Sequence, residues 1–169
     1  MGCDIIDEVR LDGERVSSTR IRRLVEAGEL DAACRLLGHP YLLQGEVAHG
    51  KGLGSRLGFP TANLSVDPRR LLPAYGVYAG RMGLGEGRFP CAVNIGVRPT
   101  VHDGGGVSVE AFLLDFDGDL YGKTARLELF HRLRFEQTFD SLEALRRQVQ
   151  ADARAVRAYF GETDGGVRG

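Results

Sequence analysis

The chain has 169 residues, which is enough for one domain with its own hydrophobic core and a smaller appended segment. Its 22 Lys and Arg residues nearly balance its 23 Asp and Glu residues, so nothing in the charge indicates binding to nucleic acid or another polyanion. Three cysteines without a CxxC pair argue against a disulfide framework or a zinc site, and they favour the cytoplasm. No apolar run approaches the roughly 18 residues of a membrane-spanning helix.

Residues 17–38 are the first predicted elements, and they form two short helices. A serine or threonine of the VSSTRIR stretch can cap the first helix, and Gly28 is a natural end for it. The second helix ends at Gly38, with a proline two residues later. About 40 residues of this kind do not easily form a core alone. We therefore expect a linker, or the tail of a larger module, that packs on the domain that follows.

Short strands are predicted next, separated by glycine-rich turns such as GEG, HDGGG and FDGD. They cover residues 42–49, 75–82, 88–95, 107–116 and 123–133. No helix-length segment lies between successive strands, which argues against parallel crossover connections. The pattern predicts an antiparallel barrel or sandwich, and a closed barrel would leave no exposed sheet edge.

A C-terminal helix is the last predicted element. Asp140 can cap it, with Glu143 in the capping-box position three residues later. Apolar residues then recur at spacings of three and four, at Leu142, Leu145, Val149, Ala153, Val156 and Phe160. This stripe is expected to lie on the barrel, and residues 163–169 are expected to form a flexible tail.

A glycine-rich loop, HGKGLGSRLG, lies just before Pro60. It matches neither the P-loop pattern nor the dinucleotide-binding pattern, and no helix follows it. Its glycines would nevertheless let backbone N–H groups approach an anion closely, beside two cationic side chains. The residues concerned are Gly50, Lys51, Gly52, Gly54, Arg56 and Gly58. The spacing alone leaves open a flexible hairpin loop without a ligand.

The PTAN stretch directly follows that loop. If the chain is extended there, Thr61 and Asn63 project to one side and Ala62 to the other. A hydroxyl and a carboxamide beside a cationic loop suit Mg²⁺, which prefers oxygen ligands and shares its shell with phosphates and water. The alternative is that both side chains only satisfy backbone groups of a turn.

Glu110 lies in VSVEAFLLDF, where both faces of the predicted strand are largely apolar. A carboxylate between such neighbours loses solvation, which favours its protonated form and suits a general base. A glutamate paired with an arginine, or exposed at a strand end, is the alternative. Arg134 and Glu136 precede the last helix, in a segment that is either a solvated connector or a flap over a site.

Taken in order, the segments HGKGLGSRLGFPTANL, LLPAYGVYAG, AVNIGVRPT, VEAFLLDFDGDLYG and LRFEQTF resemble riboflavin kinase. The resemblance extends from Leu43 to Phe160. VSSTRIR and LLGHPY resemble the end of the adenylyltransferase module of bacterial bifunctional riboflavin kinase/FAD synthetases. This second resemblance implies that residues 1–40 are a remnant of the adenylyltransferase module with its helical linker. Residues 41–162 would then be the kinase barrel and its C-terminal helix.

The resemblance implies a six-stranded antiparallel Greek-key barrel and transfer of the ATP γ-phosphoryl group to the riboflavin 5′-hydroxyl, giving FMN and ADP. The resemblance also implies, by residue match, that Thr61 and Asn63 would bind Mg²⁺ and the nucleotide phosphates and that Glu110 would be the general base. The loop residues that close over ATP are Gly50, Lys51, Gly52 and Gly54, and Arg134 lies near the flavin.

Two other functions remain to be weighed. One is a non-catalytic β-barrel module that binds a nucleotide or flavin; the presence of both PTAN and Glu110 argues against it. The other is FMN adenylyltransfer to give FAD, which the full-length parent would carry out. No two histidines of the chain have the spacing of the HxGH nucleotide-binding motif, so we do not expect this activity here.

Overall fold

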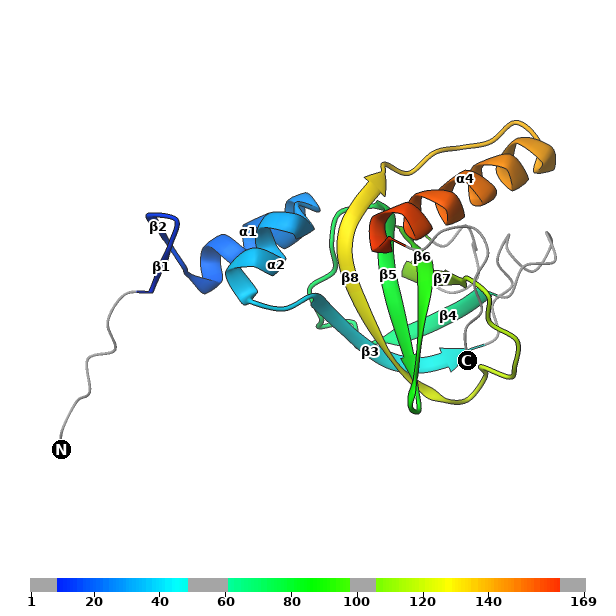
Figure 1. Ribbon diagram of the computed structural model, residues 1–169, viewed down its shortest axis with the longest axis horizontal. Coiled ribbons are helices and arrows are strands. Elements are labelled where there is room, and N and C mark those ends of the chain that lie inside the picture. Colours follow the sequence, from blue (N-terminus) through cyan, green and yellow to red (C-terminus); the bar gives the residue numbers. More distant parts are fainter. Residues whose placement is uncertain (1–8, 49–60, 98–105, 162–169) are drawn as a thin grey trace.

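The computed structural model of the protein describes residues 9–48, 61–97 and 106–161. It contains a small N-terminal segment, a β-barrel and a C-terminal helix that lies against the barrel (Figure 1). The N-terminal segment comprises β1 (Arg10–Leu11), β2 (Glu14–Arg15), α1 (Ser18–Ala27) and α2 (Leu30–Leu37). The barrel and the last helix comprise β3 (Tyr41–Ala48), β4 (Thr61–Val66), β5 (Gly76–Leu84), β6 (Gly87–Val97), β7 (Val107–Leu113), β8 (Thr124–Arg134) and α4 (Leu142–Phe160).

The six barrel strands close in the order β3-β4-β7-β6-β5-β8, and every pairing is antiparallel. Strands β5, β6 and β7 follow one another as neighbours, and β8 returns to lie beside β5, which is the Greek-key arrangement. The predicted six-stranded antiparallel barrel is confirmed. Closure pairs the edges of all six strands.

The barrel interior is filled by alternate residues of each strand. Buried interior side chains include Leu43, Val47, Ala62, Leu64, Tyr78, Met82, Val93, Ile95, Val109, Ala111, Leu113, Leu127 and Leu129. Because successive residues of a strand point to opposite faces, the residues between them lie on the outer face. Thr61 and Asn63 on β4, Glu110 on β7 and Asn94 on β6 are therefore on the outside of the barrel.

Two barrel strands differ clearly from the sequence prediction, and the ends of the other barrel strands lie within two residues of the predicted positions. The segment Thr61–Val66 forms β4, which the sequence pattern did not identify as a strand, because its polar residues alternate with only two core residues. Strand β7 ends at Leu113, three residues before the predicted end. Asp115 has a left-handed φ of 53°, which ends the extended backbone there.

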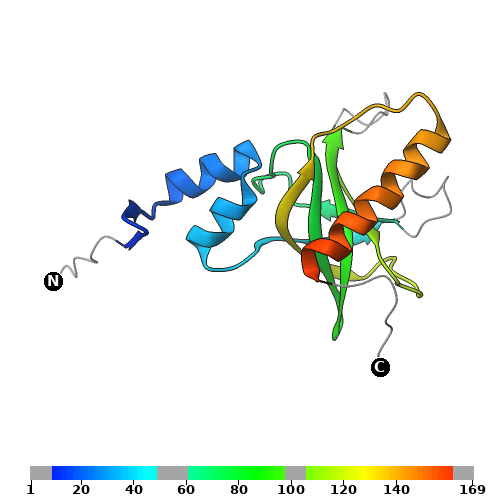
Figure 2. The ribbon, with the colours of Figure 1, turned by 45° about the horizontal axis from the view of Figure 1, so that its top comes forward.

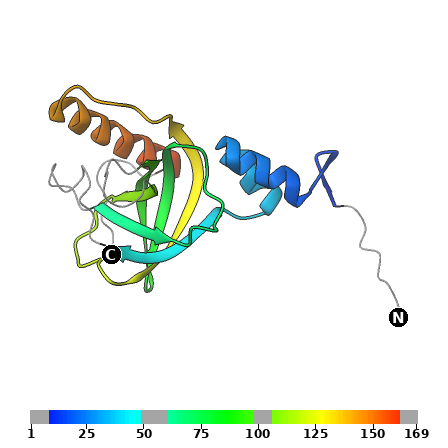
Figure 3. The same cartoon turned by 180° about the vertical axis from the view of Figure 1, so that it is seen from behind.

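The N-terminal helices have the predicted boundaries and pack on the barrel. The Ser17 side chain caps α1, and Gly28 and Gly38 end the two helices in the left-handed conformation. Val25 of α1 and Leu30 of α2 are fully buried in the same apolar cluster as the barrel interior. The pair of helices lies at one end of the barrel in all three ribbon views (Figure 1, Figure 2, Figure 3). A short hairpin of two two-residue strands, β1 and β2, precedes these helices, and the sequence analysis did not predict it.

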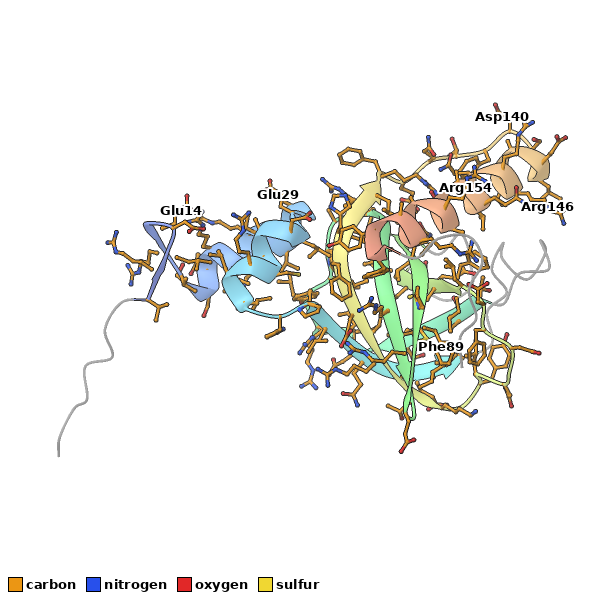
Figure 4. The ribbon with its side chains drawn as sticks, viewed as in Figure 1. Glu14, Glu29, Phe89, Asp140, Arg146 and Arg154 are labelled. Atoms are coloured by element: carbon orange, nitrogen blue, oxygen red, sulfur yellow. The ribbon has the colours of Figure 1, made fainter. Side chains whose placement is uncertain are left out.

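Helix α4 covers part of the outer face. Val77 and Ala79 of β5 and Ala92 of β6 pack with the helix residues Ala153 and Val156 in a second apolar cluster. Exposed charges on α4 include those of Arg146 and Arg154 (Figure 4).

Asp140 is not the cap of α4, contrary to the sequence prediction. Ser141 is the N-cap, and its Oγ accepts a hydrogen bond from the Ala144 backbone N–H at 3.1 Å. Leu142 is 55% exposed and does not belong to the buried stripe, because it lies in the first turn of the helix. Among the described residues, no helix is long and apolar enough to span a membrane.

Candidate active site

Strand register brings the main predicted site residues together. Asn63 of β4 is directly opposite Glu110 of β7, and on the other side of Glu110 lies Asn94 of β6. Residues opposite each other in an antiparallel pair point to the same face, with Cβ atoms about 4.5–5.5 Å apart. Thr61 is two residues before Asn63 and shares its face. The outer face thus carries a row Asn63–Glu110–Asn94, with a hydroxyl beside one end.

Two atoms of this row are buried and have no hydrogen-bond partner: Asn63 Nδ2 and Glu110 Oε1. The first is a donor and the second an acceptor, and they belong to opposing residues. A buried polar group without a partner costs about 1–3 kcal/mol, so such groups are rare outside functional sites. A hydroxyl group can accept from the amide and donate to the carboxylate, and it would satisfy both atoms.

Thr61 and Asn63 also fit a hard cation. Each residue is only 7% exposed, although both lie on the outer face of the barrel. Both side chains carry oxygen atoms, the ligands that Mg²⁺ prefers. The Glu110 carboxylate next to Asn63 adds negative charge. In the described ranges, no group of three His, Cys, Asp or Glu residues could hold a metal. A cation here would therefore take much of its coordination from substrate phosphates and water.

Arg134 lies on the same row but three strands away from Glu110. The row continues from Asn94 to Val77 of β5 and then to Arg134 of β8. With about 4.8 Å between neighbouring strands, Arg134 is roughly 14 Å from Glu110 along the sheet, so only an elongated substrate could touch both. Its guanidinium donates to both carboxylate oxygens of Asp152 on α4, at 2.8–3.2 Å. Gln148 also donates to Asp152.

Asp152 is buried and Arg134 is mostly buried in this pair, with side chains 8% and 20% exposed. Removing one partner of a buried ion pair leaves an uncompensated charge, which typically costs 3–5 kcal/mol. We expect Asp152→Ala to lower the free energy of unfolding by about 3 kcal/mol, measured by urea denaturation.

The control for this prediction is Asp115→Asn, because asparagine tolerates the left-handed backbone at this position whereas alanine would be strained there. Asp115 also accepts hydrogen bonds from an arginine of α4, Arg157, but its side chain is 64% exposed. An exposed pair contributes about 0–1 kcal/mol. Equal losses for the two variants would show that burial of the Arg134 pair does not matter.

The predicted ATP-loop residues Gly50, Lys51, Gly52 and Gly54 lie outside the described residues, so their placement stays a prediction. Sequence reasoning missed two residues that the fold adds to this region, Asn94 and Asp152. Asn94 is a polar residue within the otherwise apolar AVNIGV stretch, and this is the signal by which it could have been singled out.

These features define an antiparallel β-barrel domain with a polar site on its outer face, unlike the helix-based phosphate sites of P-loop and dinucleotide-binding folds. A family model described as "Flavokinase: Riboflavin kinase" matches residues 37–160, and the chain belongs to the riboflavin kinase family.

The names of curated relatives also include riboflavin kinase. A bifunctional riboflavin kinase/FMN adenylyltransferase of Pseudomonas fluorescens is 46% identical over 150 residues, covering 89% of this chain and 48% of the relative. The protein of that name from Escherichia coli K12 is 43% identical over 152 residues, again covering 89% of this chain and 48% of the relative. The chain thus spans about half the length of the curated relatives it matches, and the matched half is their riboflavin kinase part.

Two solved structures are similar in fold. A crystal structure titled macrolide-efflux protein from Streptococcus pneumoniae aligns with a TM-score of 0.82 and 33% identity, over 90% of this chain and 50% of that one. Riboflavin kinase from Trypanosoma brucei aligns with a TM-score of 0.54 and 29% identity, over 72% of this chain and 80% of that one. The second structure supports the barrel with its C-terminal helix as a riboflavin kinase fold.

Proposed function

We propose that this domain is an ATP-dependent riboflavin kinase, which transfers the γ-phosphoryl group of ATP to the riboflavin 5′-hydroxyl and releases FMN and ADP. One observation carries the proposal within a chain of this family. The unpartnered donor Asn63 Nδ2 and the unpartnered acceptor Glu110 Oε1 belong to directly opposed residues, as a site for an alcohol acceptor requires.

Glu110 would act as the general base. Its Oε1 accepts the proton of the acceptor hydroxyl while the hydroxyl oxygen forms a bond to the γ-phosphorus, and the bond from that phosphorus to the ADP oxygen breaks. Phosphoryl transfer needs little covalent chemistry from a protein, so positioning and charge neutralisation supply most of the rate. The burial of Asn63 and Thr61 beside Glu110 excludes water from that position.

Thr61 and Asn63 would hold Mg²⁺ and the nucleotide phosphates through their side-chain oxygens. Mg²⁺, when bound, would neutralise charge on the phosphates during transfer. In the same proposal, Gly50, Lys51, Gly52 and Gly54 close over ATP, and Arg134 contacts the flavin end of the substrate. Because the Arg134 guanidinium already pairs with Asp152, any contact with flavin would use its remaining N–H groups or its apolar stem.

The longer protein represented by this chain would also contain an adenylyltransferase module, of which residues 1–40 would be the last part and linker, with the kinase domain at residues 41–162. The support for this proposal is that the relatives are named as bifunctional riboflavin kinase/FMN adenylyltransferases. A cytoplasmic location is part of the same proposal, and it is supported by free Cys34 and Cys91.

The test is to incubate the purified chain with riboflavin, ATP and MgCl₂ and to separate the flavins by chromatography. We expect FMN and no FAD. A folded protein that forms no FMN but still binds flavin or ATP would instead be the non-catalytic binding module. FAD among the products would show that the chain retains adenylyltransferase activity.

A further inference from the structure

Asn94 is the second polar neighbour of Glu110, on the side away from Asn63. The register places it directly opposite Glu110, on the same outer face. Opposed residues have Cβ atoms about 4.5–5.5 Å apart, which lets a carboxamide reach a carboxylate. Asn94 is half-buried, and the next predicted site residue on its side of Glu110, Arg134, lies two strands further along the row.

The other strand neighbours of Asn94 offer its side chain no hydrogen-bonding group of their own. On β6 its face carries Ala92 and Gly96, and across on β5 it is opposite Val77. Ala92 and Val77 are covered by α4 in the second apolar cluster. Glu110 is thus the polar side chain among the four residues that surround Asn94 on the sheet.

A second carboxylate approaches this position from the connector before α4. The carboxylate of Glu136 rests on Gly96, and a Cβ added at Gly96 would collide with it. Asn94 is therefore next to Glu110 across the sheet, and the Glu136 carboxylate lies over Gly96, two residues further along the same face as Asn94. An asparagine NH₂ group has two N–H donors and suits such surroundings, whereas an aspartate would add a third negative charge.

We propose that Asn94 is a positioning residue. The two side chains are adjacent without a hydrogen bond in the structure, and in the complex with substrate the Asn94 carboxamide would donate to the Glu110 carboxylate and keep Oε1 directed at the acceptor hydroxyl. The inference rests on the proposed function of Glu110 as general base. Asn63 and Asn94 flank Glu110 from the two neighbouring strands, so one amide would hold the carboxylate while the other faces the substrate. A catalytic group must be held within a fraction of an ångström, and a misplacement of 1 Å can lower the rate about 100-fold.

The test measures steady-state kinetics of Asn94→Ala alone and in a Glu110→Gln background. We expect Asn94→Ala to lower kcat about 10- to 100-fold with little change in either KM, because misdirection of Glu110 affects the transition state. In the Glu110→Gln background, the same substitution should lower kcat no further. Equal fold losses in both backgrounds would overturn the proposal, because Asn94 would then act independently of Glu110.

Further variants separate positioning from packing. Asn94→Asp keeps the shape of the side chain but removes its donor, so we expect it to lower kcat at least as much as Asn94→Ala. An Asn94→Asp protein with the parent kcat would contradict the inference. Riboflavin binding, measured by flavin fluorescence, and the melting temperature should stay near the parent values for Asn94→Ala. The matched control is Ser108→Ala. Ser108 lies on the same face of β7 as Glu110, two residues before it, and its hydroxyl donates to the Gly96 carbonyl oxygen. Ser108→Ala should keep the parent kcat.

The experiment also distinguishes this inference from the proposed function. If Glu110→Gln retains the parent kcat, the general base is wrongly assigned, and the role of Asn94 is wrong with it. If Glu110→Gln is strongly impaired while Asn94→Ala has the parent kcat, only the role of Asn94 is overturned.

Discussion

Glu110→Gln is expected to lower kcat for FMN formation about 10²- to 10⁴-fold, the usual contribution of a general base. Glutamine keeps the size of the side chain and can still contact a hydroxyl, but it cannot accept its proton. The KM values for riboflavin and ATP should change little, since the lost interaction develops in the transition state. Initial rates at varied substrate concentrations, with FMN quantified by chromatography, give both parameters.

The matched control for this prediction is Glu26→Gln. Glu26 is an exposed carboxylate on α1, in the helical segment at the other end of the barrel from the start of β4 (Figure 1, Figure 3). The control variant should have the parent kcat. Parent-like turnover by Glu110→Gln would mean that the carboxylate takes no part in proton transfer.

Asn63→Ala is the prediction with the second largest effect. Loss of its carboxamide removes a ligand for Mg²⁺ and a donor to the reacting oxygens, and removal of one such preorganised group typically costs about 10²–10³ in rate. We expect kcat/KM for Mg·ATP to fall by about that factor. Thr61→Ala should also reduce the use of Mg·ATP, with a higher Mg²⁺ concentration needed for half-maximal activity.

The stability of Asn63→Ala should behave in the opposite way. Asn63 Nδ2 is a buried donor without a partner, so its removal relieves a penalty that offsets the lost packing. We expect a melting temperature at or above that of the parent, as for many residues that serve function at the expense of stability. Ser65→Ala is the control, because Ser65 lies on the same strand and face but is exposed. A large loss of stability in Asn63→Ala would assign this residue a structural role.

The barrel could be predicted from the sequence because most of its strands carry a clear alternation of core residues. Strand β4 lacked this signal. With only Ala62 and Leu64 directed into the core, TANLSV resembles a turn, and it becomes a strand through its pairing with β3 and β7. That pairing is a tertiary effect that local propensity does not contain.

The candidate site was predictable as a set of residues and not as an arrangement. Composition and motif placed Thr61, Asn63 and Glu110 in one list, but only the register of β4 and β7 makes Asn63 and Glu110 direct neighbours. Asn94 depends on the register of β6 in the same way. Register between strands distant in the chain is set by the packing of the whole core, which a single sequence does not display.

Two details of α4 show what local reading could and could not provide. Asp152 lies three residues from Val149 and four from Val156, so it is an acidic residue on the buried stripe, and such a residue requires a partner. The need could have been predicted, but its partner on β8 could not. Asp140 and Ser141 are both good capping residues, and the choice of Ser141 depends on where the preceding connector leaves the barrel.

The most direct test of the central claim is the transfer of labelled phosphate from [γ-³²P]ATP by the purified chain in the presence of riboflavin and MgCl₂. We expect label to enter FMN, with one ADP released for each FMN formed, and we expect the Glu110→Gln variant to lose nearly all of this transfer. A folded parent protein that leaves riboflavin unlabelled would contradict the assignment of riboflavin kinase activity to this domain.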